Sequence, residues 1–269
     1  MNENQKIRLL HLYNNIMNLY GEYANLLALK RFIENNTEAE CEIVSADKVS
    51  DVLPLDSFDL IYIGAGTEKA QKTAISDITA YREELKNAAE NKTTVLFTGN
   101  ACELLGSSVK NVKGEIFPCL GYFDFETEET TKRITSDAVC ENMFLDLFSE
   151  DDELYKLLKE NITIGFINKC SIIKWKESPK SMFKLLLGVG DDNKKTEDGV
   201  ISGNIIASHL IGPLMIKNPH LLKFIAYKIF SNRGQNKIAD SLTGVDLPLE
   251  SKAYLVSVNE LKNRISQES

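Results

Sequence analysis

The chain has 269 residues, of which 43% are hydrophobic and 26% are charged, with only modest numbers of glycine and proline. This composition excludes the disordered, collagen-like and membrane-spanning classes and is typical of a globular protein. The formal net charge is −8, and no cluster of Lys and Arg residues forms a basic groove, so nucleic acid is not expected as a partner.

The amino-terminal half alternates buried strands with amphipathic helices. Four apolar runs without polar alternation are typical of strands that are covered on both faces. Two further segments carry apolar residues at every third and fourth position, which is typical of helices. The expected strands are 7–13, 41–46, 60–64 and 94–98, and the expected helices are 22–34 and 70–91. This order predicts βαβ units and a parallel sheet.

The character of the chain changes from about Glu115 onward, where strand-like segments are separated by charged turns rather than by long helices. An acidic run beginning at Glu150 precedes Leu154, Leu157 and Leu158, a pattern typical of an acidic first turn that opens a short amphipathic helix. We interpret residues 143–161 as a helical insertion. The expected strands are 116–127, 133–140, 162–167, 182–187 and 201–209, and a further helix is expected at 218–230.

These elements predict a single α/β domain over residues 1–269, because no linker, repeat or low-complexity tract divides the chain. The predicted architecture has three layers, with a mostly parallel sheet flanked by helices and an antiparallel extension in the carboxyl-terminal half.

The cysteines and the first apolar run indicate the compartment. Five cysteines are scattered along the chain without a Cys-x-x-Cys pair, which fits neither a disulfide framework nor a zinc site. The run at 7–13 is too short for the core of a signal peptide or for a membrane span. We therefore expect a cytoplasmic protein with reduced, mostly structural thiols, no membrane span and no cofactor.

Two polar motifs favour structural interpretations. Residues 188–193, Gly-Val-Gly-Asp-Asp-Asn, lack the following helix, the Walker lysine and the glycine spacing of a nucleotide loop, so we interpret them as a hairpin turn. The acidic residues between Asp124 and Glu129 have no histidine or second carboxylate cluster beside them. A solvated strand end is the better interpretation, and no metal site is predicted.

Two turns that follow buried strands are candidate binding elements. Gly64-Ala65-Gly66 comes directly after the strand that begins at Leu60. Its backbone N–H groups are expected at the carboxyl edge of the sheet, where α/β proteins bind ligands, although a plain tight turn explains the glycines equally well. Residues 95–106 predict a strand, a sharp turn and a helix, the geometry that places a nucleophile at the positive end of a helix. The residue at the apex of that turn is Gly99.

Several segments in the same order resemble the class I (cysteine-dependent) glutamine amidotransferases of the CobB/CobQ type. Within that family, the segments resemble the glutaminase subunit that pairs with a Mur-ligase-like protein in lipid II amidation. The resemblance covers most of the chain, except the insertion and the tail. The matching segments are Asn18-Leu19-Tyr20-Gly21, Asn25-Leu26-Leu27-Ala28-Leu29, Gly64-Ala65-Gly66, Leu104-Leu105-Gly106, Leu120-Gly121-Tyr122-Phe123-Asp124-Phe125, Thr127-Glu128, Arg133 and Gly212-Pro213.

The resemblance implies that both catalytic side chains are missing. Leu105-Gly106 resembles the end of the family's Cys-Gly-Gly-Tyr-Gln-x-Leu-Gly elbow, which places Gly99 at the nucleophile position. Gly212-Pro213 resembles the family's His-Gly-Pro, which places Ile211 at the histidine position. In an active member, cysteine attacks the carboxamide of glutamine, histidine relays protons, and backbone N–H groups stabilise the oxyanion. Glycine adopts the strained conformation of such an apex at little cost.

The resemblance also implies a binding site for glutamine or another small amino acid. Its residues are Gly64, Ala65, Gly66, Asn100 and Arg133. A guanidinium suits an α-carboxylate through paired hydrogen bonds, although an ordinary surface arginine is an equally good interpretation of Arg133. Alanine in place of the family's central glycine restricts the turn and crowds a ligand.

Three functions follow as hypotheses. The first is a catalytically degenerate glutamine amidotransferase-like subunit that forms a heterodimer with a Mur-ligase-like enzyme of peptidoglycan precursor (lipid II) amidation. The second is an active glutaminase that uses a relocated pair, Cys102 and His209, although a buried helical thiol and a core histidine would explain the same residues. Cys102 lies about 4.5 Å along the helix from the apex, and His209 about 6.6 Å along its strand from Ile211. The third hypothesis is a non-catalytic scaffold or amino-acid sensor.

Overall fold

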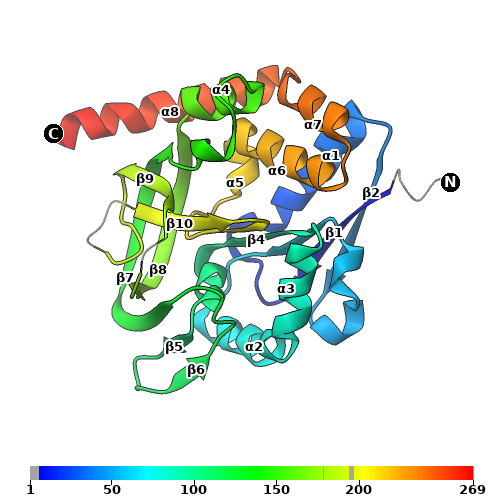
Figure 1. Cartoon of the computed structure of the whole chain (residues 1–269). Coiled ribbons are helices and arrows are strands. Elements are labelled where there is room, and N and C mark those ends of the chain that lie inside the picture. Colours follow the sequence, from blue (N-terminus) through cyan, green and yellow to red (C-terminus); the bar gives the residue numbers. More distant parts are fainter. Residues whose placement is uncertain (1–5, 178, 194–196, 269) are drawn as a thin grey trace.

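A mixed sheet of eleven strands forms the centre of the computed structural model, which describes residues 6–177, 179–193 and 197–268 (Figure 1). Its strand order is β2-β1-β3-β4-β11-β10-β9-β7-β5-β6, with β8 paired to β7. The strands are β1 (Lys6–Leu12), β2 (Glu40–Ala46), β3 (Leu60–Ile63), β4 (Thr94–Thr98), β5 (Ser108–Lys110), β6 (Ile116–Pro118), β7 (Phe125–Asn142), β8 (Thr163–Trp175), β9 (Ser181–Leu187), β10 (Glu197–Ser202) and β11 (Ile205–Ser208).

The sheet has a parallel half and a largely antiparallel half. Strands β2, β1, β3, β4 and β11 pair in parallel. From β11 to β10, β9, β7 and β8 the pairing is antiparallel. The central strands β3 and β4 are buried along their whole length, as expected for parallel strands that are covered on both faces. The predicted fold class, with a parallel core and antiparallel strands in the carboxyl-terminal half, is confirmed.

Helices cover both faces of the parallel half (Figure 1). Helices α1 and α6 pack with α5 on one face, and α2 and α3 lie on the other. The α-helices are α1 (Tyr23–Asn36), α2 (Glu68–Ile78), α3 (Arg82–Glu90), α4 (Glu153–Glu160), α5 (Leu214–Lys217), α6 (Pro219–Asn232), α7 (Asn236–Thr243) and α8 (Pro248–Glu268). The short 3₁₀ helices are η2 (Leu19–Gly21), η3 (Val49–Val52), η4 (Leu55–Ser57), η5 (Thr79–Tyr81), η6 (Gly99–Leu105) and η7 (Leu145–Leu147).

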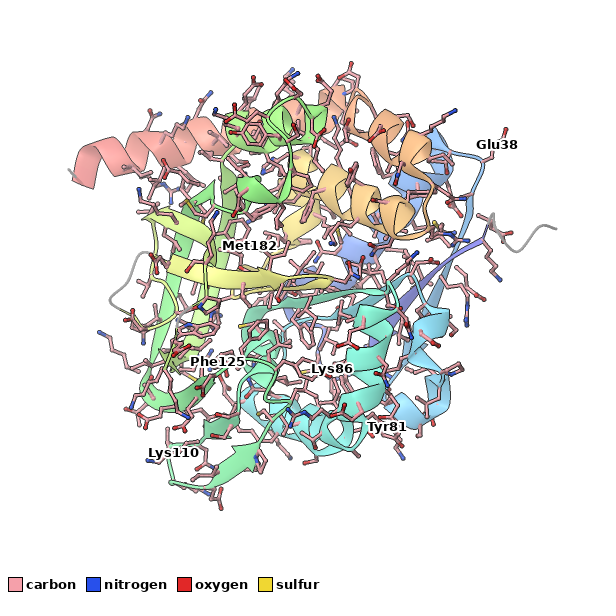
Figure 2. All side chains as sticks on the ribbon, viewed as in Figure 1. Glu38, Tyr81, Lys86, Lys110, Phe125 and Met182 are labelled. Carbon is pink, nitrogen blue, oxygen red and sulfur yellow. The ribbon has the colours of Figure 1, made fainter. Side chains whose placement is uncertain are left out.

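Two large apolar layers fill the space on either side of the sheet. One layer includes Leu29, Met182 and Phe224, and the other includes Phe97 and Phe125. Figure 2 shows Met182 and Phe125 among the side chains of these two layers. Burying one side chain of this size contributes about 1.5–3 kcal/mol, so the two layers stabilise the packing of the helices on both faces of the sheet.

The prediction of one continuous helix over 70–91 is wrong, because the segment forms two helices. Helix α2 ends at Ile78 and α3 begins at Arg82. The hydroxyl of Thr79 donates to the carbonyl of Ile75 at 2.8 Å, a local bond that competes with continued helix geometry. Tyr81 then leaves the helical region, with φ −117° and ψ 28°.

Two predicted strands are also interrupted. The segment 116–127 breaks after Pro118, which has no N–H with which to extend the ladder, and β7 begins only at Phe125. The segment 201–209 is divided between β10 and β11. Gly203 has φ +57° in the tight turn between them, where glycine allows the hairpin to close. The predicted strands 133–140 and 162–167 are parts of the longer strands β7 and β8.

The region 143–161 contains η7 and α4. Leu154 and Leu158 of α4 are buried in the same apolar layer as Phe144, so the predicted amphipathic helix is confirmed. Its status as an insertion and the single domain over 1–269 stay predictions. Helices α7 and α8 were not predicted. Among the described residues, no helix combines the length and the apolar character that crossing a membrane requires.

Candidate functional site

Three neighbouring parallel strands, β3, β4 and β11, end at the same edge of the sheet. The Gly64-Ala65-Gly66 turn follows β3, Gly99 follows β4 directly, and Ile211 lies three residues beyond Ser208, the end of β11. The structure therefore brings together the turn and the two positions predicted for the nucleophile and the histidine.

Gly99 lies at a crowded, left-handed turn. Its φ is +61°, and a Cβ built on it would lie 2.6 Å from the Cβ of Ala65 and 2.9 Å from Cγ2 of Ile211. Distances below 3.0 Å are essentially absent for real Cβ atoms. Ala65 and Ile211 are both buried, and Ile211 is fixed by two backbone hydrogen bonds to Phe166. A side chain at position 99 therefore has no room unless one of these neighbours moves.

A buried carboxylate connects the strand ends. Glu22 is fully buried and accepts hydrogen bonds from the hydroxyls of Tyr62 and Thr98. It also accepts the backbone N–H of Gly212 at 3.1 Å. Thr98 and Gly212 are the direct chain neighbours of the two predicted catalytic positions, so one side chain holds both. Burial raises the pKa of Glu22, and the hydrogen bonds offset only part of that shift.

The predicted ligand-binding residues line one very small cavity. Ala65, Gly66, Asn100 and Arg133 border a space of about 20 Å³. A single water molecule needs about 10–15 Å³, whereas sites for small organic ligands measure about 300–1,000 Å³. Gly64 does not belong to the lining. The cavity in this conformation holds about one water molecule and cannot hold glutamine.

The donor groups of this cavity already have partners within the chain. Oδ1 of Asn100 accepts the backbone N–H of Gly66 at 2.9 Å. Nη1 of Arg133 donates to Oδ1 of Asn168 at 2.9 Å, and Nη2 donates to Glu68. The turn and the guanidinium are therefore engaged by protein groups at the places where a ligand would be held.

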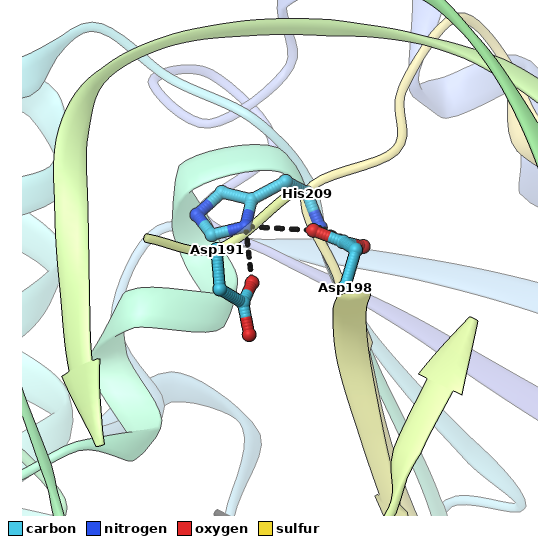
Figure 3. A group of neighbouring side chains, drawn as sticks. All are labelled: Asp191, Asp198 and His209. Atoms are coloured by element: carbon cyan, nitrogen blue, oxygen red, sulfur yellow. Dashed lines mark hydrogen bonds and ion pairs between the residues drawn. The ribbon is translucent and has the colours of Figure 1, made fainter. Parts of the chain in front are cut away.

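His209 lies in a buried ionic cluster beneath the edge (Figure 3). Its Nδ1 is 3.0 Å from Oδ1 of Asp198 and 3.1 Å from Oδ1 of Asp191. Its Nε2 is 3.5 Å from Oε1 of Glu103. Burial lowers the pKa of His209, but the surrounding groups, including the two hydrogen-bonded aspartates, outweigh burial and hold the pKa well above its usual value.

The structure brings Cys102 and His209 together, as the relocated-pair hypothesis requires, but it leaves both inaccessible. Cys102 is 5% exposed and His209 is 2% exposed. Burial raises the pKa of the Cys102 thiol to about 12, although the adjacent His209 acts to lower it. The thiol is therefore protonated at neutral pH, and a protonated thiol is a poor nucleophile.

Asp191, Asp198 and His209 each offer one ligand atom within 4.8 Å of the others, so their geometry could hold a metal ion. Burial raises the pKa of Asp191. Burial opposes ionisation of Asp198 and Glu103, but hydrogen bonds with His209 outweigh it and lower their pKa values. Lys169 is buried beside the cluster, and its Nζ donates to the backbone carbonyls of Gly190 and Asp191.

Sequence reasoning missed the partners of the predicted site residues. Residues 188–193 do lie in the connection between the antiparallel strands β9 and β10, which also includes residues outside the described part, but Asp191 points inward onto His209. Glu103 lies within the predicted elbow, residues 95–106. Its position inside the apolar run 101–105 was an available signal, because a charge in a buried segment needs a partner. Glu22 had no comparable signal.

Comparisons with known proteins identify the family that the chain resembles in sequence. A model of the CobB/CobQ-like glutamine amidotransferase domain matches residues 8–219. "Lipid II isoglutaminyl synthase (glutamine-hydrolyzing) subunit GatD" of Streptococcus pneumoniae is 25% identical over 239 residues, which cover 88% of this chain and 84% of that protein. The subunit of the same name from Staphylococcus aureus is 22% identical over 229 residues, covering 85% and 86%. A crystal structure of a glutamine amidotransferase is 14% identical, with a TM-score of 0.51 and coverage of 82% and 98%, and shows the shared fold alone.

We predict that Gly99→Ala lowers the free energy of unfolding by about 2–5 kcal/mol, measured by urea denaturation. A left-handed residue with a Cβ costs about 1–2 kcal/mol, and overlap in a packed site costs about 1–3 kcal/mol. Gly203→Ala is the matched control, since Gly203 has φ +57° and nothing within 4 Å of its added Cβ. The Gly203→Ala variant should lose only about 1–2 kcal/mol, which is what the left-handed conformation costs. Adding Ala65→Gly to Gly99→Ala should restore part of the stability, and equal losses at 99 and 203 would contradict the packing argument.

The raised pKa of Glu22 predicts a pH-dependent effect of Glu22→Gln. The folded state binds the proton of Glu22 more tightly than the unfolded state, where the pKa is about 4.3. Wild-type stability from this group is therefore fully present below that value and is lost as the pH rises through the folded-state pKa. Unfolding free energies measured at several pH values from 4 to 8 should shift in favour of the Gln variant as the pH rises. Glu38→Gln, at an exposed position, should leave the profile parallel to wild type, and a parallel profile for Glu22→Gln would refute the prediction.

Proposed function

Because this chain belongs to the CobB/CobQ-like glutamine amidotransferase family, we propose that it is a glutamine amidotransferase-like subunit that does not hydrolyse glutamine. Glycine offers no nucleophile at position 99, and isoleucine cannot relay protons at position 211. The chain keeps the strand ends, the turn and the sheet of the family while the two reacting side chains are absent.

The observation that carries the proposal is the mutual contact of Gly99, Ala65 and Ile211. The space into which a cysteine side chain would project is filled by the Cβ of Ala65 and by Cγ2 of Ile211. The cavity nearby, at about 20 Å³, leaves no volume for a glutamine molecule next to that turn. Both the nucleophile and its substrate are therefore excluded by packing as well as by residue identity.

We further propose that the partner is a Mur-ligase-like enzyme that acts on peptidoglycan precursors. The two curated relatives are each described as a subunit of lipid II isoglutaminyl synthase, and the similarity extends over more than four fifths of each chain. A chain that has lost its own chemistry but keeps the whole fold of such a subunit retains the surface that a partner needs. Its role is then to bind and position the ligase in a heterodimer.

An active glutaminase that uses Cys102 and His209 is the second candidate. In its favour, His209 is hydrogen-bonded to Asp198 and interacts with Cys102, which supplies the set of nucleophile, base and orienting carboxylate. Against it, the thiol is buried with a pKa of about 12. Neither Cys102 nor His209 lines the small cavity beside the turn, so a substrate carbonyl has no path to the thiol in this conformation.

The proposal predicts that the purified chain releases no glutamate from glutamine above background, either alone or with a co-expressed Mur-ligase-like protein. The reason is the absence of a nucleophile at position 99. Cys102→Ala should leave the background unchanged. Glutamate release by the wild-type chain would count decisively against a degenerate subunit, and its loss in Cys102→Ala would identify a relocated nucleophile.

The proposal also predicts a stable complex. Co-expressed chain and Mur-ligase-like protein should co-elute in size-exclusion chromatography, with a mass by light scattering that equals one copy of each. A Mur ligase that functions without a glutaminase subunit is the control and should elute separately. If both ligases eluted separately from the chain, the proposed partner would be wrong. The proposed lack of glutamine hydrolysis would still be tested by glutamate release.

A further inference from the structure

Three side chains of the buried cluster bring one ligand atom each to the same place (Figure 3). Asp191 lies between β9 and β10, Asp198 lies on β10, and His209 directly follows β11. Nδ1 of His209 is 3.0 Å from Oδ1 of Asp198 and 3.1 Å from Oδ1 of Asp191. This nitrogen carries at most one proton, which cannot point straight at both oxygens. The geometry therefore presents two carboxylate oxygens to one nitrogen that satisfies only one of them well.

We propose that Asp191, Asp198 and His209 form a structural binding site for a zinc ion or a similar first-row divalent metal. The ion binds Nδ1 of the imidazole and Oδ1 of each aspartate, and the proton of Nδ1 is released to solvent. An imidazole ligand favours zinc over magnesium and calcium, which prefer oxygen ligands alone. The inference goes beyond the proposed function, because the ion ties strand ends together and takes no part in glutamine chemistry.

The ligand atoms have the spacing that a metal requires. Bonds of about 2.0–2.2 Å from zinc to nitrogen and oxygen place neighbouring ligand atoms about 3.0–3.5 Å apart, depending on the bond angle. The two distances from Nδ1, 3.0 and 3.1 Å, lie at the lower end of this range. These ligands therefore need only a small outward shift to admit the ion. In zinc sites with three protein ligands, water occupies the fourth position.

Groups outside the site hold both carboxylates in position. Oδ2 of Asp198 accepts the hydroxyl of Ser208 at 2.5 Å and the backbone N–H of His209 at 3.1 Å. Oδ2 of Asp191 accepts the indole N–H of Trp175 at 3.0 Å. In both carboxylates, Oδ1 is the oxygen that lies closest to Nδ1. Orientation of the ligands by such outer hydrogen bonds is typical of metal sites.

The second nitrogen of the imidazole faces a further carboxylate. Nε2 of His209 is 3.5 Å from Oε1 of Glu103, and both side chains are buried. With an ion on Nδ1, Nε2 keeps the single N–H of the ring and directs it towards Glu103. A carboxylate, a histidine and a metal in this order are common in zinc sites, where the carboxylate fixes the ring and raises its basicity.

Lys169 is the basic residue that acts against an ion here, because it is buried beside the cluster. Its Nζ donates to the backbone carbonyls of Gly190 and Asp191 at 2.6 and 2.9 Å. Those contacts fix the backbone on either side of one ligand and do not occupy the carboxylate oxygens. The charge of the lysine repels an ion, whereas the buried carboxylates of Asp191, Asp198 and Glu103 attract it.

The test compares the full chain refolded from denaturant with zinc and with a chelator, so that the ion is supplied before the site is buried. Plasma mass spectrometry should find about one zinc ion per chain. The melting temperature should be about 5 °C or more higher with zinc, and magnesium should cause no such rise. Emission of Trp175, the only tryptophan of the chain, should change with zinc, since its indole is bonded to Asp191.

The variants Asp191→Asn and Asp198→Asn change each carboxylate with almost no change in shape. Each should lose the bound zinc and the rise in melting temperature, and if Asp198→Asn fails to fold, Asp191→Asn decides the question. Asp146→Asn is the matched control and should behave as wild type, because it makes the same change at an exposed carboxylate that pairs with Lys180 at 2.7 Å. A wild type that binds no zinc, or zinc that remains in the site variants, overturns the inference.

Cobalt(II) in place of zinc identifies the ligands directly. Imidazole and carboxylate ligands predict a visible absorption spectrum without a charge-transfer band from sulfur to the metal. Such a band would show that one of the five cysteines binds the ion, and it would overturn the inference. Glutamate release is measured in the same samples and bears on the proposed function alone, so failure of either one leaves the other to stand on its own result.

Discussion

The edge of the sheet depends on one buried carboxylate, that of Glu22. It accepts hydrogen bonds from Tyr62 on β3, from Thr98 at the end of β4 and from the backbone of Gly212 after β11. A buried carboxylate without donors would cost several kcal/mol, so these contacts fix the relative positions of three strand ends and the start of α1. The geometry of the edge is therefore maintained by a buried carboxylate and not by the residues at positions 99 and 211.

Two zones with different physical properties lie on this edge. At Gly99 the contacts are apolar and close, and any added atom displaces Ala65 or Ile211. At Arg133 the contacts are polar, half-exposed and individually weak. Close apolar packing resists the addition of a side chain at position 99, whereas an exposed ion pair opens at small cost. The two zones of the edge therefore differ in how easily they rearrange.

Apolar runs predicted the parallel strands well, because a strand that is covered on both faces buries nearly every side chain and therefore forms a continuous apolar run. The second helical segment breaks at Thr79–Tyr81, where the backbone forms a 3₁₀ turn, which periodicity cannot reveal. The Gly64-Ala65-Gly66 turn and Gly99 were predictable because parallel strands deliver their carboxyl ends to one edge. Glu22 was not, since its partner Gly212 lies 190 residues away. Glu68 was not predictable either, because its pairing with Arg133 depends on how β7 passes α2 in space.

The buried cluster around His209 needs no catalytic explanation. Its members are buried and hydrogen-bonded to one another, and removal of one member of a buried ion pair typically costs about 3–5 kcal/mol, because the partner is left uncompensated. Replacing Asp198 alone would leave His209 buried without this carboxylate partner. Replacing His209 alone would leave Asp198 buried without its imidazole partner. Such a cluster resists stepwise replacement whether or not it performs chemistry. Its resemblance to a nucleophile, base and carboxylate is therefore weaker support for turnover than the access of a substrate to Cys102 would be, and the described structure provides no such access.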